Sequence, residues 1–148
     1  MTFYKYHGTG NDFVLFDNRD GKLQFSTEQV ANLCDRHFGI GADGLMLLEK
    51  AEGYDFKMVY YNSDGNESTM CGNGGRCLVT IKKSLGIITN KANFIAIDGP
   101  HTATINDDIV DLHMQDVDSI EIHEGHSILN TGSPHYVRWV TDVVKTDV

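Results

Sequence analysis

The segment Met70 to Cys77 places a thiol beside three glycines and an arginine, in the order Met-Cys-Gly-Asn-Gly-Gly-Arg-Cys. We predict that this Gly-rich segment is a loop that leads into the start of a helix, because the residues after it are apolar at helical spacing. Backbone N–H groups at a helix start are unpaired, and their partial positive charge binds anions and stabilises a thiolate. Cys71 is therefore a candidate acid/base or nucleophile. The amides of Gly72 and Asn73 are candidates for holding a substrate carboxylate.

The same segment is also compatible with an ordinary Gly-rich turn whose cysteine has no chemical role. The sequence contains two other cysteines. Cys34 falls on the apolar face of an expected helix and Cys77 is expected to face the core, so we predict structural roles for both. The spacing from Cys71 to Cys77 matches no common zinc pattern, which argues against a metal site. An odd number of cysteines gives no support to a disulfide framework.

Two asparagines and one histidine are weaker candidates, because each lies in or beside a polar turn. Asn11 and Asn62 are typical of turns in which the side chain bonds only to nearby backbone. His135 follows the turn Thr-Gly-Ser-Pro, where it either tunes a neighbouring thiol or is simply exposed. The residues by themselves favour the local interpretation for all three.

The elements that must position these side chains are many short strands and two separate helices, which indicate an α+β fold. A capping-box pattern at Ser26 and Gln29 begins the first helix, expected over about 27–38, and the second follows the Gly-rich segment and stops at Gly86. A polar patch at 115–118 marks a candidate boundary. We expect strands at 3–7, 13–17, 45–48, 56–61, 94–97, 101–105, 109–114, 120–122 and 136–140.

The composition of the 148 residues, 41% hydrophobic and 22% charged, is typical of a soluble globular protein. The formal net charge of −9 and the lack of any basic run argue against nucleic acid and anionic membranes as partners. No apolar stretch is long enough for a signal peptide or a membrane span. We therefore expect a cytoplasmic protein.

Five blocks of the sequence resemble diaminopimelate epimerases in content, order and spacing. The resemblance spans nearly the whole chain, but only the first half of a family member. The blocks are residues 7–13 (HGTGNDF), 35–44 (DRHFGIGADG), 62–65 (NSDG), 70–77 (MCGNGGRC) and 132–135 (GSPH).

The resemblance implies two similar α+β domains, each with mixed or antiparallel strands wrapped around a central helix, and an active site in the cleft between them. It also implies catalysis without pyridoxal phosphate, metal or any other cofactor. Two cysteines, one from each domain, face opposite sides of the substrate α-carbon. One takes the proton as thiolate while the other delivers a proton as thiol, which interconverts LL- and meso-diaminopimelate, a precursor of lysine and peptidoglycan.

The resemblance also assigns roles to individual residues. Cys71 matches one of the two catalytic thiols, and the amides of Gly72 and Asn73 match the substrate cradle. The remaining matches assign substrate contacts to Asn11 and Asn62, and assign to His135 the tuning of the acidity of the catalytic thiols. Ser133 stands where many family members carry asparagine, and its shorter side chain lacks the amide that would contact substrate.

The family's second Cys-Gly motif and its Glu-Arg clamp are absent from these 148 residues. We therefore expect residues 1–115 to be the N-terminal epimerase-like domain, and 116–148 to be the opening strands of an incomplete second domain. Unpaired strands and apolar surface would favour a homodimer or association through that second part. We also expect poor epimerase activity from the chain alone.

Three alternatives belong beside this interpretation. Proline and hydroxyproline racemases resemble the fold and use a cysteine pair, but carry histidine where Asn73 stands. Phenazine-pathway isomerases resemble the architecture but lack the thiol of Cys71. A non-catalytic binding or assembly half-domain is the alternative from another class.

Overall fold

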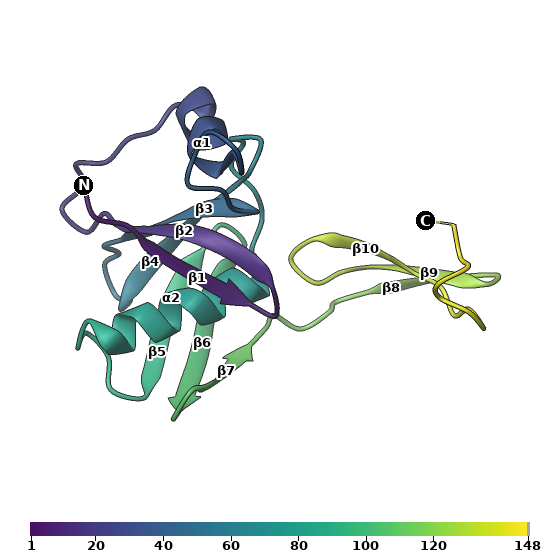
Figure 1. The fold of residues 1–148 in the computed structure, drawn as a ribbon. Helices are drawn as coiled ribbons and strands as arrows, with labels where there is room; N and C mark the ends of the chain where they lie inside the picture. The colour runs from purple at the N-terminus through teal and green to yellow at the C-terminus, as the bar shows by residue number, and fades with distance from the viewer. Residues whose placement is uncertain (148) are drawn as a thin grey trace. The chain divides into compact units, whose positions relative to one another are not determined.

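The computed structural model describes residues 1–147. These residues divide into two compact units, 1–114 and 115–147. The first unit holds a seven-stranded sheet whose spatial order follows the chain, together with two helices (Figure 1). The α+β class is therefore confirmed. Its elements are β1 (Tyr4–Gly8), β2 (Asn11–Asp17), α1 (Thr27–Cys34), β3 (Gly44–Glu49), β4 (Phe56–Asn62), α2 (Gly72–Ser84), β5 (Lys91–Ala96), β6 (Gly99–Asn106) and β7 (Ile109–His113).

The central strands of this sheet are buried on both faces, because a helix packs on each. In β2, Phe13 and Leu15 pack with α2, whereas Val14 and Phe16 pack with α1. The pairs β2–β3 and β4–β5 are parallel, and β3–β4 is antiparallel, so the two crossovers start from strands of opposite direction. Crossovers of the usual right-handed kind then require helices on opposite faces, as observed.

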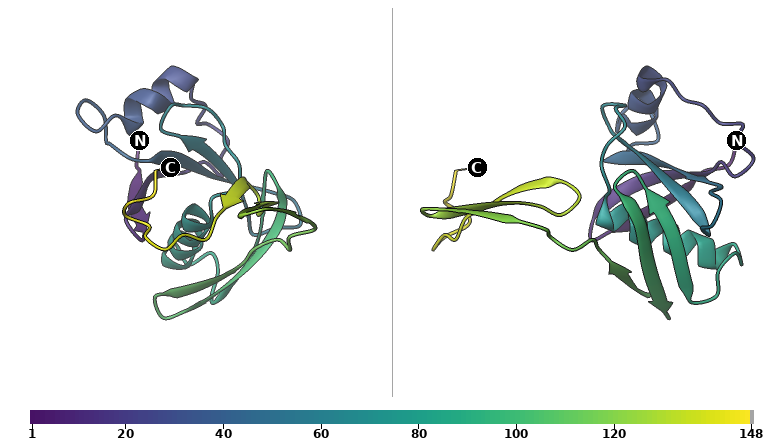
Figure 2. Two further views of the ribbon diagram at one scale, coloured as in Figure 1. Left: turned by 90° about the vertical axis from the view of Figure 1, so that its right-hand side faces the viewer. Right: turned by 180° about the vertical axis from the view of Figure 1, so that it is seen from behind.

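The sheet curls around α2, which contacts β1 and β2 near one edge and β6 and β7 at the other. Seven strands at about 4.8 Å spacing make a flat sheet about 29 Å wide, far wider than the roughly 10 Å helix. One helix can touch both edges only if the sheet bends round it, and Figure 2 shows α2 lying within the curve of the strands. The wrapped arrangement implied by the family resemblance is therefore present in this unit.

The Gly-rich segment after Cys71 is helical, which corrects the expectation of a loop. α2 begins at Gly72 itself, so Gly74 and Gly75 lie in its first turns. A Cβ atom on Gly74 would lie 1.7 Å from Cε of the buried Met46. The glycines therefore let this end of the helix approach the sheet, and packing outweighs their poor helix propensity.

Helix α1 ends at Cys34, four residues before the expected stop at Phe38. Asp35 adopts an extended conformation, and its carboxylate accepts hydrogen bonds from the backbone N–H groups of His37 and Phe38 at 2.8 and 2.6 Å. This local bonding offers the backbone an alternative to further helix. The capping box of Ser26 and Gln29 is present as predicted.

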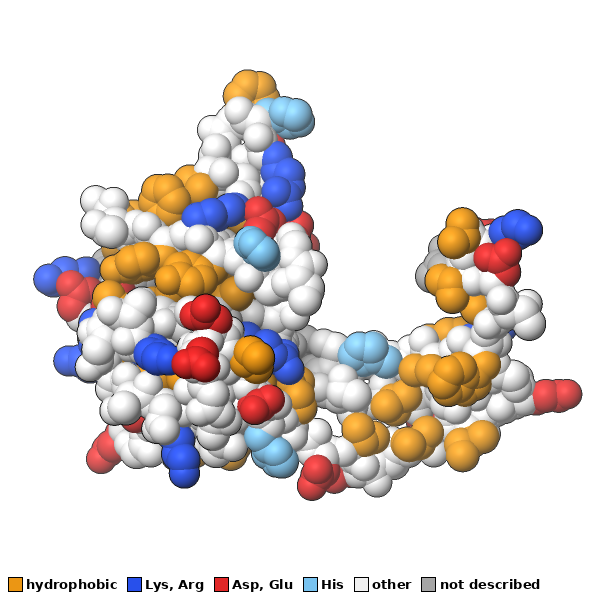
Figure 3. All heavy atoms as spheres, turned by 60° about the horizontal axis from the view of Figure 1, so that its bottom comes forward, with side chains coloured by type: hydrophobic (Ala, Val, Ile, Leu, Met, Phe, Trp, Pro, Cys, Tyr) orange, Lys and Arg blue, Asp and Glu red, His pale blue; other side chains and the backbone are white. Residues whose placement is uncertain are grey.

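The second unit contains a three-stranded antiparallel sheet in the order β10–β9–β8. Its strands are β8 (Ile120–His123), β9 (His126–Asn130) and β10 (Pro134–Val137), and β9 has no counterpart among the expected strands. All residues of β8 and β10 are exposed. Hydrophobic side chains gather on the surface of this unit (Figure 3). Its exposed hydrophobic residues include Ile120, Ile122 and Trp139.

Candidate active site

Cys71 caps the N-terminus of α2, with extended backbone angles of φ −114° and ψ 112°. Its carbonyl accepts the first helical hydrogen bond, from the N–H of Gly75 at 2.8 Å, and its side chain makes no capping bond. The thiol is half-buried, whereas those of Cys34 and Cys77 are buried. Cys71 is thus the one cysteine of the sequence with an accessible thiol, and it lies beside the free N–H groups of a helix.

Asn11, at the start of β2, meets the N-terminus of α2. Its side-chain oxygen lies 3.8 Å from the sulfur of Cys71 and accepts a hydrogen bond of 3.3 Å from the amide of Asn73. A Cβ atom on Gly8, at the end of β1, would lie 3.1 Å from Cβ of Asn73, so a glycine there permits the close approach. The structure therefore brings together Asn11, Cys71 and the first turn of α2.

Asp43, just before β3, connects Asn11 to the end of β4. One of its carboxylate oxygens accepts hydrogen bonds from the Asn11 amide at 2.9 Å and from the Asp12 backbone N–H at 3.1 Å. Its backbone carbonyl accepts from the N–H of Ser63 at 3.1 Å. Asn62, one residue earlier, is exposed and pairs in register with Gly44. Asn62 thus lies at the same end of the sheet as Asn11.

Two cations hold the carboxylates under this site. Asp12 forms ion pairs of 2.8 Å with both Lys5 and Arg36, and Arg36 also reaches Asp43 at 2.7 Å. The hydrogen bond from Arg36 holds the pKa of Asp12 far below its usual range. The hydrogen bond from Asn11 is the main cause that lowers the pKa of Asp43. Both carboxylates are therefore charged at neutral pH.

The charged residues beneath Asn11 were not among the candidates from the sequence. Asp12, Arg36 and Asp43 all lie inside the blocks that resemble the epimerases, and this was the available signal. The contacts of Asp12 with Arg36 and of Asn11 with Asp43 join different blocks, 24 and 32 residues apart, so no pattern within a single block indicates them.

Tyr60, a half-buried tyrosine on β4, was also not among the candidates from the sequence. Burial, together with the negative charge that Cys71 carries when ionised, raises the pKa of Tyr60 to about 12. The same two causes raise the pKa of Cys77 to about 11. Both groups therefore stay protonated at neutral pH.

His135 lies in the second unit, on β10, and is exposed. Its Nδ1 is 2.8 Å from the carbonyl oxygen of Ser133 and 3.3 Å from the hydroxyl of Thr131. A carbonyl can only accept, so Nδ1 carries a hydrogen. In the neutral ring Nε2 is then the proton acceptor.

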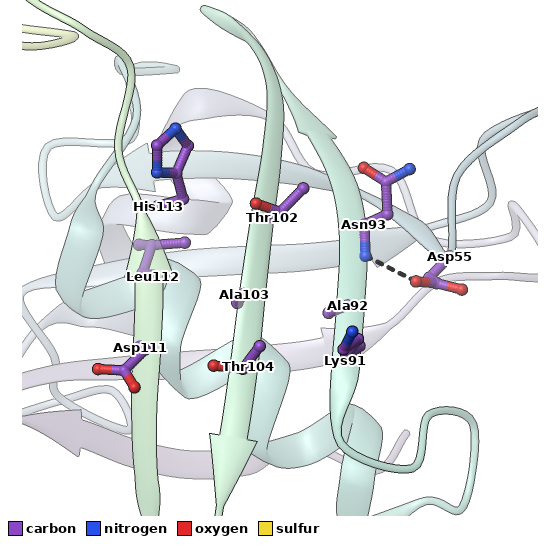
Figure 4. Close-up of a pocket in the computed structure, with 10 residues that line it drawn as sticks. All are labelled: Asp55, Lys91, Ala92, Asn93, Thr102, Ala103, Thr104, Asp111, Leu112 and His113. Atoms are coloured by element: carbon purple, nitrogen blue, oxygen red, sulfur yellow. Dashed lines mark hydrogen bonds between the residues drawn. The ribbon is translucent and has the colours of Figure 1, made fainter.

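A separate hollow of about 660 Å³ lies on the outer face of β5, β6 and β7, away from α2. Figure 4 shows its polar lining, with Asn93 bonded to Asp55 through its backbone N–H at 2.7 Å. None of the candidate residues lines it.

In residues 1–147 no group of three or more potential metal-ligating side chains comes together. No helix in the same range has the length and apolar character to cross a membrane.

The thiol at the start of α2, the Asn11 contact and the curled sheet can now be compared with known proteins. The sequence profile described as diaminopimelate epimerase matches residues 3–118. The chain belongs to the diaminopimelate epimerase family. The match covers all but the first two residues of the first unit of the structure and every candidate residue except His135.

Curated relatives agree with this assignment. A diaminopimelate epimerase of Flavobacterium psychrophilum is 58% identical over the whole chain, and one of Chlorobaculum tepidum is 40% identical over 95% of it. A third, from Aquifex aeolicus, is 37% identical over the whole chain. The chain spans about 60% of the length of these relatives, at 59%, 58% and 60% respectively.

Solved structures share the fold at low sequence identity. A hydroxyproline epimerase from Agrobacterium vitis aligns with a TM-score of 0.62 and 14% identity, over 92% of this chain and 50% of the other. A phenazine biosynthesis protein from Bacillus anthracis aligns with a TM-score of 0.59 and 13% identity, over 90% and 52%. These similarities establish the fold alone.

Proposed function

We propose that this chain carries one acid/base half of a cofactor-independent diaminopimelate epimerase, with Cys71 as the thiol that serves one face of the substrate α-carbon. The observation that carries the proposal is the half-buried thiol at the N-cap of α2, 3.8 Å from the side-chain oxygen of Asn11. Family membership and the 58% identical epimerase support the substrate.

The start of α2 suits an amino-acid carboxylate. The N–H groups of Gly72 and Asn73 lie in the first turn, where helical partners are absent and the helix dipole favours an anion. A carboxylate bound there sets the α-carbon beside Cys71. The same dipole stabilises the negative charge that develops when the weakly acidic α-proton leaves. Asn11 and Asn62 contact the remaining polar groups of the substrate.

Inversion needs a proton donor on the opposite face of the α-carbon. Cys34 and Cys77 do not serve, because both are buried and burial raises the pKa of each thiol. We propose that the opposing thiol belongs to a second domain, of which 116–148 forms the opening strands, and that His135 tunes the thiols. We further propose that the enzyme is cytoplasmic, acts on an amino acid, and belongs to the synthesis of lysine and peptidoglycan precursors. We expect it to associate as a homodimer or through its second unit, and to bind neither nucleic acid nor membranes.

The proposal is tested by alkylation of the chain with iodoacetamide, with and without diaminopimelate, and by quantifying each cysteine by peptide mass spectrometry. We expect diaminopimelate to slow the labelling of Cys71 several-fold, and L-proline at the same concentration to leave it unchanged. Cys34 and Cys77 provide internal controls, since their labelling should not respond to substrate. Equal labelling of Cys71 with and without diaminopimelate would refute the proposed site.

A second measurement separates proton transfer from inversion. In D2O the wild-type chain is expected to exchange the α-proton of diaminopimelate slowly and to invert it at background rate, because one thiol serves one face. The variant C71S should lose the exchange, whereas C34A should keep it. Rapid inversion by the 148 residues alone would contradict the two-thiol mechanism.

A further inference from the structure

The side-chain amide of Asn11 donates a hydrogen bond through its nitrogen and accepts through its oxygen. Its nitrogen donates to the carboxylate of Asp43 at 2.9 Å. Its oxygen accepts from the amide of Asn73 at 3.3 Å and lies 3.8 Å from the sulfur of Cys71. The amide therefore has a defined orientation, with the oxygen toward the thiol.

Asp43 decides this orientation, because a charged carboxylate can only accept hydrogen bonds. A flipped Asn11 would turn its oxygen toward that carboxylate and its NH2 toward the NH2 of Asn73, so both contacts would become repulsive. Asp43 itself is fixed from two further sides, by the guanidinium of Arg36 at 2.7 Å and by the backbone N–H of Asp12 at 3.1 Å. The orientation is thus imposed from below the site.

The orientation matters for the proton on Cys71. An oxygen facing the sulfur accepts a hydrogen bond from the protonated thiol, whereas an NH2 group in its place would donate to the thiolate. The N-terminus of α2 acts in the opposite sense, since its partial positive charge stabilises the thiolate. An acid/base that must both give and take a proton works best when neither form dominates.

We infer that Asp43 is a positioning residue that locks the amide of Asn11 with its oxygen toward the sulfur of Cys71, so that Asn11 can accept a hydrogen bond from the thiol but cannot donate one to the thiolate. The inference rests on the proposed function for its catalytic meaning. Its physical content concerns the free chain and needs no substrate.

The test is the pH dependence of Cys71 alkylation in four chains: wild type, D43N, N11A and the double variant. We expect D43N to move the midpoint of the labelling curve to lower pH by about half a unit or more, because the freed amide can turn its NH2 toward the thiolate. In the N11A background the same substitution should have a much smaller effect. This cycle isolates the coupling between the two residues.

D43N also removes a negative charge, which by itself would favour the thiolate of Cys71. The set of four chains therefore needs a control for charge. Asp64 lies in the turn after β4, and D64N removes one carboxylate without touching Asn11. We expect D64N to shift the midpoint less than D43N. An equal shift by D43N with and without Asn11 would overturn the inference, since charge alone would then explain it.

A measurement on the wild-type chain tests the inference even if D43N fails to fold. By NMR, the side-chain amide protons of Asn11 should exchange with solvent more slowly than those of the exposed Asn106, because one of them is bonded to Asp43. Equal exchange would overturn the inference. Protection of Cys71 by diaminopimelate does not depend on either result, so this inference and the proposed function can fail separately.

Discussion

The first and second turns of α2 carry the same residue type in two different surroundings. Cys71, at the N-cap, is half-buried beside Asn11 and the unpaired N–H groups of the helix. Cys77, less than two turns later, lies in the core enclosed by the sheet, where burial raises the pKa of its thiol to about 11. The chemistry available to a cysteine in this fold is therefore set by its position along one helix.

The largest expected difference between the two turns is in reactivity. At pH 7.5 we expect iodoacetamide to label Cys71 at least about 100-fold faster than Cys77, because only a small fraction of a buried, high-pKa thiol is ionised. The rates are measured in the native chain by peptide mass spectrometry. Labelling in urea is the control, and there the two rates should converge. Comparable native rates would remove the distinction.

A serine pair sharpens the comparison in terms of stability. C77S should lower the free energy of unfolding by about 1–3 kcal/mol, because it places a hydroxyl group in an apolar core that offers it no dedicated hydrogen-bond partner. C71S should raise it by about 0.5–1 kcal/mol, because serine is a good N-cap and the native side chain makes no capping bond. Urea unfolding followed by circular dichroism measures both.

Opposite signs for the two serine variants would support the view that Cys71 is kept for reactivity at some cost in stability. A loss of stability in C71S equal to that in C77S would show that Cys71 is a packing residue.

The smallest expected effect is on the pH dependence of stability, and it concerns Lys82, near the C-terminal end of α2. Its side chain is fully buried, its ammonium donates to the backbone oxygen of Asp55 at 2.8 Å, and it lies 5.2 Å from the ring centre of Phe56. Burial lowers the pKa of Lys82 below its usual 10.5. Between the lowered pKa and 10.5 the unfolded chain binds more protons than the folded one, so stability rises with pH across that window.

The variant K82M should lack this rise, and K83M, at the next position, provides the matched control. Urea unfolding at several pH values between 7 and 10.5 measures it. Parallel pH profiles for wild type and K82M would show that the buried lysine does not titrate differently on folding.

Much of the fold followed from the sequence, because strands buried on one or both faces leave a clear apolar pattern. The pattern failed where tertiary contacts outweighed local preference. The glycines after Cys71 entered a helix because packing against Met46 requires a glycine at position 74, and α1 stopped early because the carboxylate of Asp35 accepts hydrogen bonds from the next turn. β9 has only two apolar residues, Ile128 and Leu129, so its pairing on both sides defines it instead.

The candidate site divides in the same way. Cys71 and the first turn of α2 form one local motif, so the sequence was sufficient to single them out. The partners of Asn11 were not predictable, because Asp43 reaches it from 32 residues away across a parallel strand pair. Hydrogen bonds of this kind depend on register, which a single sequence does not specify.

The order of the strands in the curled sheet also bears on how the site forms. Each strand of β1 to β7 pairs with its neighbour in the chain, so every closure spans a short loop or one helix. Short closures cost little entropy and favour fast folding. The hydrogen bonds that join Asn11 to Asp43, Cys71 and Asn73 all lie within residues 11–73, so none of them depends on β5, β6 or β7.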